Sequence, residues 1–230
     1  MAKSSTYLVG FILALGFTFH CIAQTTNAPE ASVLVQGRPI AAWVAEVGLG
    51  GLPGTNIAND VLISAGPPII PALSHFLLGK ESAKDLIMRL PCVPIETKDL
   101  HASTSDTLLF KAKSASVLGA IAYRNPNAPE VLKAIPSLTT ALGSGSREVR
   151  FRAAQALGAI GKGATNAIPR LVSSTRDDDS GVRMCAVEAL GRIGASSPEA
   201  VAALKAALSD TSSDVRITAR QVMDIQKGHK

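Results

Sequence analysis

The histidine and cysteine residues of this sequence do not stand at the spacings that a metal site requires. Neither a His-x-x-x-His pair nor a Cys-x-x-Cys pair occurs, and a Gly-x-Ser-x-Gly nucleophile motif is absent too. The histidines are His20, His75, His101 and His229. We therefore expect no catalytic residue, no metal site and no bound cofactor, and we expect that the protein is not an enzyme.

Two other patterns suggest ligand binding. The segment 158–162 has the outline of a phosphate-binding loop, but Ala156 stands where its first glycine should be and Gly163 stands where a serine or threonine should follow. The run Asp177 to Asp179 could bind Ca²⁺ weakly through loop carboxylates. The same aspartates can instead cap a helix and face the positive end of its dipole, and we favour this structural role.

Three arginines recur at a fixed spacing. Arg150, Arg183 and Arg216 are separated by 33 residues each, in a chain with a formal net charge of +5. In a stacked repeat they would form one column, which could bind phosphates or an anionic surface. Only 4% of the residues are aromatic, which leaves few side chains for base stacking, so we do not expect nucleic acid as a partner.

The arginine spacing belongs to a larger repeat. Segments that begin at Ser146, Asp179 and Ser212 align without gaps, with a valine three positions after each start. Apolar residues within each segment fall at helical spacing, and the first two segments end at Gly161 and Gly194. The side-chain oxygen at each start is suited to cap a helix. The pattern therefore predicts one helix for each segment.

A second helix is predicted at the same period. Ile-Pro-x-Leu occurs at 135–138 and at 168–171, and Val-Ala-Ala-Leu occurs at 201–204. Proline is tolerated in the first turn of a helix, where its missing N–H costs little. Each unit is therefore helix, turn, helix, turn, and its two apolar stripes are buried only when units stack. A hydrophobic content of 47%, mostly small and aliphatic, suits such packing.

This pattern resembles the HEAT-like repeats of the HEAT/armadillo superfamily. The resemblance rests on a cap residue, Val-Arg, alanines at helical spacing, Ile-Gly, and then Ala-Ile-Pro-x-Leu. It implies an all-α fold, an α-solenoid of stacked helical hairpins. It also implies that the arginine column is structural, as a ladder of hydrogen bonds to the carbonyls and carboxylates of neighbouring repeats. The segment 36–43 further resembles the lead-in of exported bacterial members.

The repeat divides the chain into parts of different regularity. In chain order we expect a signal peptide at 1–23, a flexible mature N-terminus at 24–37, degenerate helices at 38–104 with a loop insert at 91–104, regular repeats at 105–226, and a tail at 227–230. Within the degenerate part, 38–47 is predicted as a capping helix, and 56–65 as a first helix before the Ile-Pro-Ala-Leu of 70–73.

The first residues indicate export. Lys3 is the only charged residue before Glu30, and the run 7–19 is uncharged and largely apolar. This pattern is typical of a secretory signal peptide, which predicts cleavage after Ala23 and a periplasmic or secreted location. The alternative is an uncleaved membrane anchor, because the run approaches the about 20 residues that span a bilayer. The remaining cysteines, Cys92 and Cys185, are expected as unlinked thiols.

A binding surface is expected on the second helices, whose outward columns are predicted to contain Ser137, Thr140, Arg170 and Ser173. We predict an exported scaffold that presents a curved helical surface to an unidentified protein or peptide. Two alternatives remain open. One is an accessory protein that is similar to the bilin-lyase type of HEAT-like proteins and holds a small ligand. The other is a binder of anionic surfaces through the basic repeats.

Overall fold

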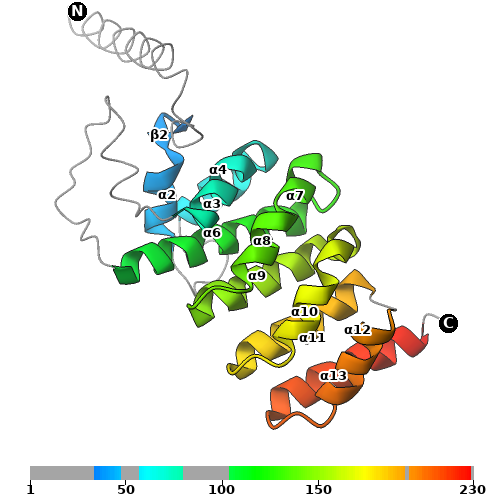
Figure 1. The fold of residues 1–230 in the computed structure, drawn as a ribbon. Coiled ribbons are helices and arrows are strands. Elements are labelled where there is room, and N and C mark those ends of the chain that lie inside the picture. The colour runs from blue at the N-terminus through cyan, green and yellow to red at the C-terminus, as the bar shows by residue number, and fades with distance from the viewer. Residues whose placement is uncertain (1–33, 48–56, 80–103, 195–196, 229–230) are drawn as a thin grey trace, which may run out of the picture.

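The computed structural model describes residues 34–47, 57–79, 104–194 and 197–228. In this part of the chain the helices follow one another along one direction, from α2 at one end to α13 at the other (Figure 1). The first helices of successive units, α6, α9, α11 and α13, pack against each other in order, while α4 packs on α8 and α10 packs on α12. The fold is therefore the predicted α-solenoid with two helical layers.

The elements have the following bounds: β1 Leu34–Val35, β2 Arg38–Pro39, α2 Ile40–Glu46, α3 Ile57–Ala65, the 3₁₀ helix η1 Pro67–Ile69, α4 Ile70–Leu78, α6 Thr104–Arg124, α7 Pro129–Lys133, α8 Ile135–Ala141, α9 Arg147–Ile160, the 3₁₀ helix η3 Gly161–Ala167, α10 Ile168–Ser174, α11 Ser180–Ile193, α12 Pro198–Ala207 and α13 Ser213–Gly228. Among the described residues no single helix is long and apolar enough to cross a membrane, and only the pair α3 and η1–α4, bent by 97°, reaches that length and composition together.

The periodic valines and leucines form the core between the layers. Val149, Val182 and Val215 are buried at the start of the three repeated helices, and Leu157 and Leu190 are buried near the ends of the first two. Burying an aliphatic side chain of this size stabilises the fold by about 1.5–3 kcal/mol. The core is continuous from α2 to α13, so the units share one hydrophobic interior.

Glycines let the first helices approach each other closely. A β-carbon added to Gly119 of α6 would lie 3.2 Å from the Cα of Ala156 in α9, and one added to Gly158 of α9 would lie 3.2 Å from the Cα of Ala189 in α11. One added to Gly191 of α11 would lie 2.7 Å from the methyl groups of Val222 in α13. Glycine is therefore required at one position of each repeat because the next helix occupies the space of a side chain.

The helix ends follow the sequence prediction in part. The Oδ1 of Asp179 accepts a hydrogen bond from the Val182 amide at 3.1 Å, which is the predicted cap of α11. Ser146 precedes α9 but its hydroxyl makes no capping bond, so that prediction is wrong; instead its amide donates to the Ser144 hydroxyl at 3.2 Å. Gly194 ends α11 in the left-handed conformation, as predicted.

The N-terminal part is more ordered than predicted. Residues 34–37, expected to be flexible, form β1 and a tight turn to β2, because Gln36 and Gly37 adopt positive φ angles of 53° and 75°. The capping helix begins at Ile40 rather than at 38, after this short hairpin. The indole N–H of Trp43 donates to the Val35 carbonyl at 2.9 Å and joins the helix to the hairpin. The predicted signal peptide, residues 24–33 and the insert up to residue 103 lie outside the described residues.

Candidate functional site

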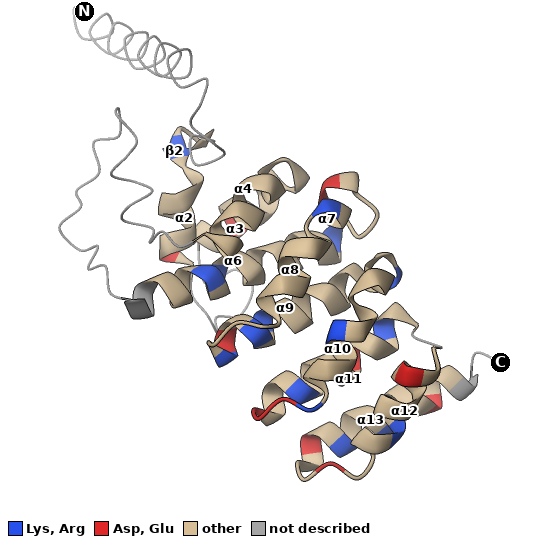
Figure 2. Cartoon of the chain, in the orientation of Figure 1, with Lys and Arg blue, Asp and Glu red and all other residues tan. Residues whose placement is uncertain are grey.

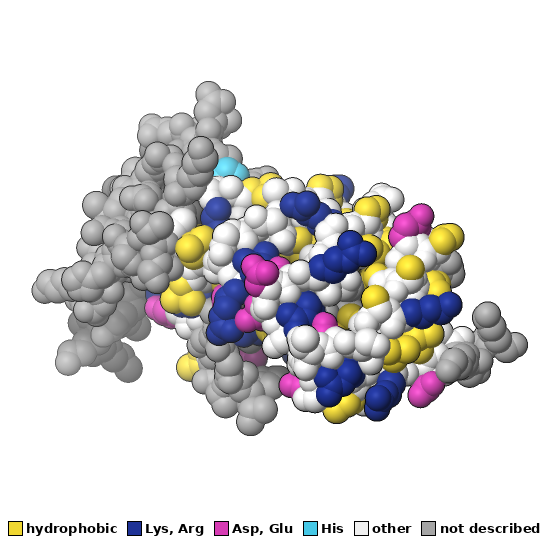
Figure 3. Space-filling model, turned by 60° about the horizontal axis from the view of Figure 1, so that its bottom comes forward, with side chains coloured by type: hydrophobic (Ala, Val, Ile, Leu, Met, Phe, Trp, Pro, Cys, Tyr) yellow, Lys and Arg dark blue, Asp and Glu magenta, His cyan; other side chains and the backbone are white. Residues whose placement is uncertain are grey.

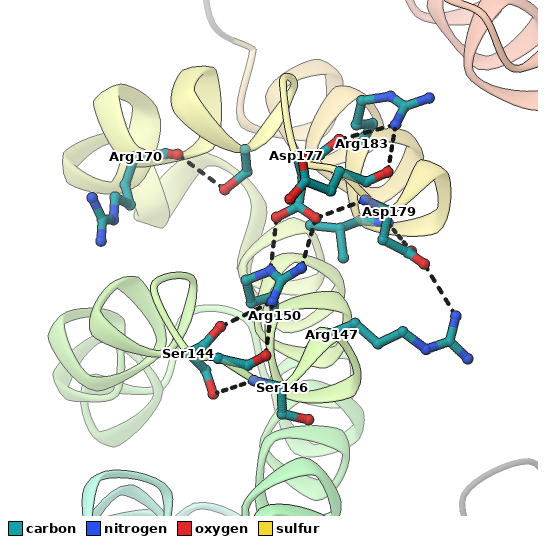
Figure 4. A network of polar contacts seen from close by, with 12 residues as sticks. Ser144, Ser146, Arg147, Arg150, Arg170, Asp177, Asp179 and Arg183 are labelled. Atoms are coloured by element: carbon teal, nitrogen blue, oxygen red, sulfur yellow. Dashed lines mark hydrogen bonds and ion pairs between the residues drawn. The ribbon is translucent and has the colours of Figure 1, made fainter.

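The arginine column joins consecutive units through ion pairs. The guanidinium of Arg150, in the first turn of α9, donates from Nε and Nη2 to the two carboxylate oxygens of Asp177 at 2.7 and 2.8 Å. Its Nη1 donates to the carbonyls of Ser144 and Gly145 at 3.0 and 3.3 Å (Figure 4). One side chain thus holds the turn before its own helix and the turn before the next first helix. This is the ladder that the resemblance implied.

The next unit repeats these contacts. Arg183 of α11 donates from Nε and Nη2 to Asp210 at 2.9 and 2.8 Å, and from Nη1 to the carbonyls of Asp177 and Asp178 at 2.9 and 3.2 Å. Figure 2 shows acidic residues in the turns before α11 and α13, close to basic residues at the starts of the same helices. Both ion pairs are largely buried, which makes their geometry well defined.

Burial and hydrogen bonding act in opposite directions on the acidic partners. Burial by itself would raise the pKa of Asp177, but the hydrogen bonds from Arg150 and from the Asp179 amide, with the charge of Arg150, lower it below its usual value. The hydrogen bond from Arg183 outweighs burial at Asp210 and lowers the pKa of that carboxyl. Both groups are therefore ionised near neutral pH and hold their arginines as ion pairs.

The basic column is not a free anion-binding stripe. The N–H groups of Arg150 and Arg183 donate to acceptors within the protein, so these two side chains are not available to bind an external phosphate. On the face brought forward in Figure 3, basic side chains are separated from one another by uncharged and acidic side chains. This arrangement does not favour the alternative in which the repeats bind an anionic surface.

The aspartate run 177–179 is used in the same way. Asp177 accepts from Arg150 and from the Asp179 amide, at 3.0 Å for the amide. Asp179 accepts from Arg147 at 3.0 Å through Oδ2 and from the α11 backbone through Oδ1. Within the described residues, no group of three or more His, Cys, Asp and Glu side chains could hold a metal ion. The run therefore serves helix capping and the ladder, as we favoured.

The predicted partner-binding column on the second helices is less accessible than expected. Ser137 is only 5% exposed and its hydroxyl donates to the Ala134 carbonyl at 2.8 Å, so the prediction that it faces outward is wrong. Thr140 and Ser173 are exposed, but their hydroxyls donate to the carbonyls four residues earlier, Pro136 and Pro169. Arg170 is exposed, with its guanidinium over Gly143. Their role in partner binding stays a prediction.

A shallow hollow lies beside this column, between α4 and α8. It has a volume of about 570 Å³ and a mainly apolar lining that includes Ile70, Leu78 and Pro136, with His75 and Lys133 at its edge. The hydroxyl of Ser74, which also lines it, is buried and has no hydrogen-bond partner. The hollow is open to solvent and lacks converging polar groups, so it is a weaker candidate than the groove described next.

The first helices carry a more enclosed groove, which the sequence did not predict. It has a volume of about 500 Å³ and crosses α3, α6, α9 and α11. Small residues form its floor: Ala115, Ser116, Gly119, Ala120, Ala156, Gly158, Ala159 and Ala189. This volume lies within the range of ligand-binding clefts in proteins. We call this feature the first-helix groove.

Larger polar and aromatic side chains line the rim of the first-helix groove. Tyr123 at the end of α6 is 71% exposed, which leaves its ring available to a ligand. Arg152 is held by Glu148 at 2.9 Å and lies over the Phe151 ring, and Arg192 is paired with Glu188 at 2.8 Å. Arginine and tyrosine are among the residue types that contribute most to the binding energy at protein interfaces.

The thiol of Cys185 also lines this groove but is not prepared for chemistry. Burial raises its pKa to about 12, so the sulfur is protonated at neutral pH and is a poor nucleophile. It is a free thiol, as predicted, and Cys92 lies outside the described residues.

The comparison with protein families agrees with the geometry. Residues 135–224 match the family model for HEAT repeats. The described part of the chain is a helical solenoid, and residues 135–224 are similar to HEAT repeats, as the sequence pattern indicated. No curated protein matches the sequence.

Solved structures share the same architecture. The complex of CpcE and CpcF of phycocyanin lyase from Nostoc sp. PCC7120 is 20% identical, with a TM-score of 0.54, and the match covers 80% of this chain and 97% of that chain. A designed armadillo repeat protein in complex with the peptide (KR)4 is 15% identical, with a TM-score of 0.47 and coverage of 90% and 98%. At these identities the similarity shows the fold alone.

Proposed function

We propose that the chain is an exported scaffold that binds a segment of another protein in the first-helix groove. The observation that carries this proposal is the rim of Tyr123, Arg152 and Arg192 above a floor of small residues. An exposed aromatic ring and arginines held by intrahelical glutamates lose little conformational freedom when they bind. The small side chains of the floor permit close approach of a partner backbone.

This proposal puts the binding face on the first helices, whereas the sequence pattern predicted it on the second helices, and the groove lining supports the choice. Three first helices contribute the floor, and α3 contributes Asn59, Asp60 and Ile63. Rigid packing of these helices through their glycines keeps the groove in one shape. A preformed groove binds without the cost of ordering its own backbone.

The test is to fill the groove without unfolding the protein. Ala159→Trp places a large ring in the groove, and Thr140→Trp places the same ring on the exposed second-helix face as a control. Proteins captured from a cell-envelope fraction by the wild type and by Thr140→Trp should be lost with Ala159→Trp, at unchanged melting temperature. If both variants captured the same proteins in equal amounts, the groove would not be the binding site.

Export rests on the N-terminal pattern of Lys3, the apolar run 7–19 and Ala23. The protein recovered from an envelope fraction should begin at Gln24 when its N-terminus is determined by mass spectrometry. Recovery of the full-length chain in the membrane fraction would favour an uncleaved anchor, and recovery in the cytosol would contradict export.

A second candidate function is the holding of a small ligand, for which the groove volume of about 500 Å³ is sufficient. The fold shared with the phycocyanin lyase complex makes a bilin the first compound to examine. A bilin held in the groove should show a visible absorbance band that changes on binding and is lost with Ala159→Trp. An unchanged spectrum would exclude this candidate.

A further inference from the structure

The third arginine of the ladder makes fewer hydrogen bonds than the other two. Nη1 of Arg216 donates to the carbonyls of Asp210 and Thr211 at 2.7 and 3.0 Å. Nη1 of Arg150 and of Arg183 makes the same pair of bonds to the turn before its own helix. The guanidinium of Arg216 is therefore anchored in the same way as the other two.

The other edge of Arg216 lacks the partner found in the preceding units. Nε and Nη2 of Arg150 and of Arg183 bind a carboxylate 27 residues further along the chain. Among residues 34–47, 57–79, 104–194 and 197–228, no carboxylate is bonded to the corresponding atoms of Arg216. This edge is a fork of two parallel N–H donors, a geometry that matches a carboxylate or a phosphate, and in the two preceding units the acceptor is an aspartate.

A hydrophobic residue next to this fork is uncovered as well. Phe151 and Met184 follow Arg150 and Arg183, and both pack partly buried against the core. The Phe151 ring lies against Gly181 in the first turn of α11. Ile217 follows Arg216 in the same way but is 51% exposed. Two independent features of the contact between units are thus present on α13, and among the described residues no turn covers them as one does in the preceding units.

The second half of α13 does not continue the pattern. Gly158 and Gly191 admit the next first helix at close range, whereas Asp224 stands at the corresponding position of α13. A charged side chain there keeps another first helix from packing at the same distance. The surface is therefore suited to a contact over the first two turns of α13 only.

We infer that the first two turns of α13 form a docking site for a partner protein that presents an aspartate in a turn leading into a helix. The carboxylate would bind Nε and Nη2 of Arg216 in the manner of Asp177 and Asp210, and the first residues of the partner helix would cover Ile217. The complementary charges and the repeated geometry of the two internal contacts define this chemistry. The site is separate from the first-helix groove.

The probe is a peptide with the sequence of residues 207–223, which contains the Asp210 turn and the start of the helix that follows it. Full-length protein labelled with ¹⁵N reports the Nε–H signals of its arginines by NMR. Addition of the peptide should shift the Arg216 signal with saturation and leave the Arg150 and Arg183 signals in place, because their forks are occupied. A peptide with Asp210→Asn should bind at least about tenfold more weakly, because it loses the charged hydrogen bonds of the carboxylate.

Arg216→Lys is the matched variant, because it keeps the charge and removes the planar fork. It should abolish peptide binding detected through backbone amides of α13, while circular dichroism and the melting temperature stay close to those of the wild type. The inference is overturned if the Arg216 signal does not respond, if the Asp210→Asn peptide binds equally well, or if all three arginines shift together.

Discussion

Gly158 of α9 lies directly against Ala189 of α11, so that a β-carbon on the glycine would be 3.2 Å from the alanine Cα. The equivalent contact between Gly191 of α11 and Val222 of α13 is tighter, at 2.7 Å to the valine methyl groups. The first contact brings α9 and α11 together beneath the first-helix groove, which Gly158 and Ala189 both line, and the second brings α11 and α13 together outside the groove.

Gly191→Ala should destabilise the protein by about 1–3 kcal/mol, because the added methyl group overlaps the stiff side chain of Val222. In a Val222→Ala background the same change should cost much less, since the overlapping methyl groups are gone. Urea unfolding of the four proteins of this cycle gives the coupling energy. Gly145→Ala is the control, because no atom lies within 4 Å of the added carbon, and an equal loss there would contradict the overlap.

Asp210→Ala should cost about 1.5–3 kcal/mol, because Arg183 loses a buried bidentate acceptor. Arg147→Ala should cost less than about 1 kcal/mol, since its pair with Asp179 is largely exposed on the arginine side. Denaturant midpoints compare the two variants. Similar losses for both would mean that burial does not strengthen the ladder.

The arginine ladder should make the stability of the folded protein depend on pH in the acidic range. The pKa values of Asp177 and Asp210 are lowered in the folded protein, so the unfolded chain takes up protons first as the pH falls. Their contribution is complete above the unfolded pKa of about 4 and is lost as the pH drops through the folded values. The melting temperature should fall from pH 5 to pH 3, and the Asp177→Asn/Asp210→Asn variant should show a smaller decrease. An identical decrease would place the acid sensitivity elsewhere.

Leu190→Asp should unfold the chain, because Leu190 is completely buried in α11 and an unpaired carboxylate there loses its hydration. Circular dichroism at 25 °C should show loss of most helical signal. The control is Gln155→Asp, which adds the same charge on the exposed side of α9 and should melt close to the wild type. A wild-type melting temperature for Leu190→Asp would disprove the assigned core.

Much of the fold could be predicted because its repeat consists of residue types with strong local structural preferences. The valines at the helix starts, the prolines in the first turns and Gly194 at a helix end each indicate an element and its boundary, and the structure confirms them. The arginine ladder was implied by the family resemblance and is confirmed by its bonds to Asp177 and Asp210.

The groove could not be predicted in the same way. Its floor depends on how far each first helix is rotated toward solvent, and Ser137 shows how sensitive such assignments are, because a small rotation turns an outward residue into a buried one. One signal was present in the sequence: Ala-Leu-Gly-Ala-Ile at 156–160 and Val-Leu-Gly-Ala-Ile at 117–121 both place glycine and alanine where helices meet or ligands approach.

The ladder divides the solenoid into two parts that are held together differently. The alignment of 117–121 with 156–160 places Lys111 of α6 at the position of Arg150. The period of 33 places Ser144 at the position of Asp177. At the joint between α6 and α9, the two ladder positions therefore hold neither an arginine nor an aspartate. Within the part of the chain that the structure describes, no ion pair joins α6 to α9, whereas ion pairs reinforce the two joints that follow. In a quasi-one-dimensional fold each joint sets the cooperativity between its neighbours. A fall in pH that protonates Asp177 and Asp210 should therefore weaken the two joints between α9, α11 and α13, and it should leave the joint between α6 and α9 unchanged.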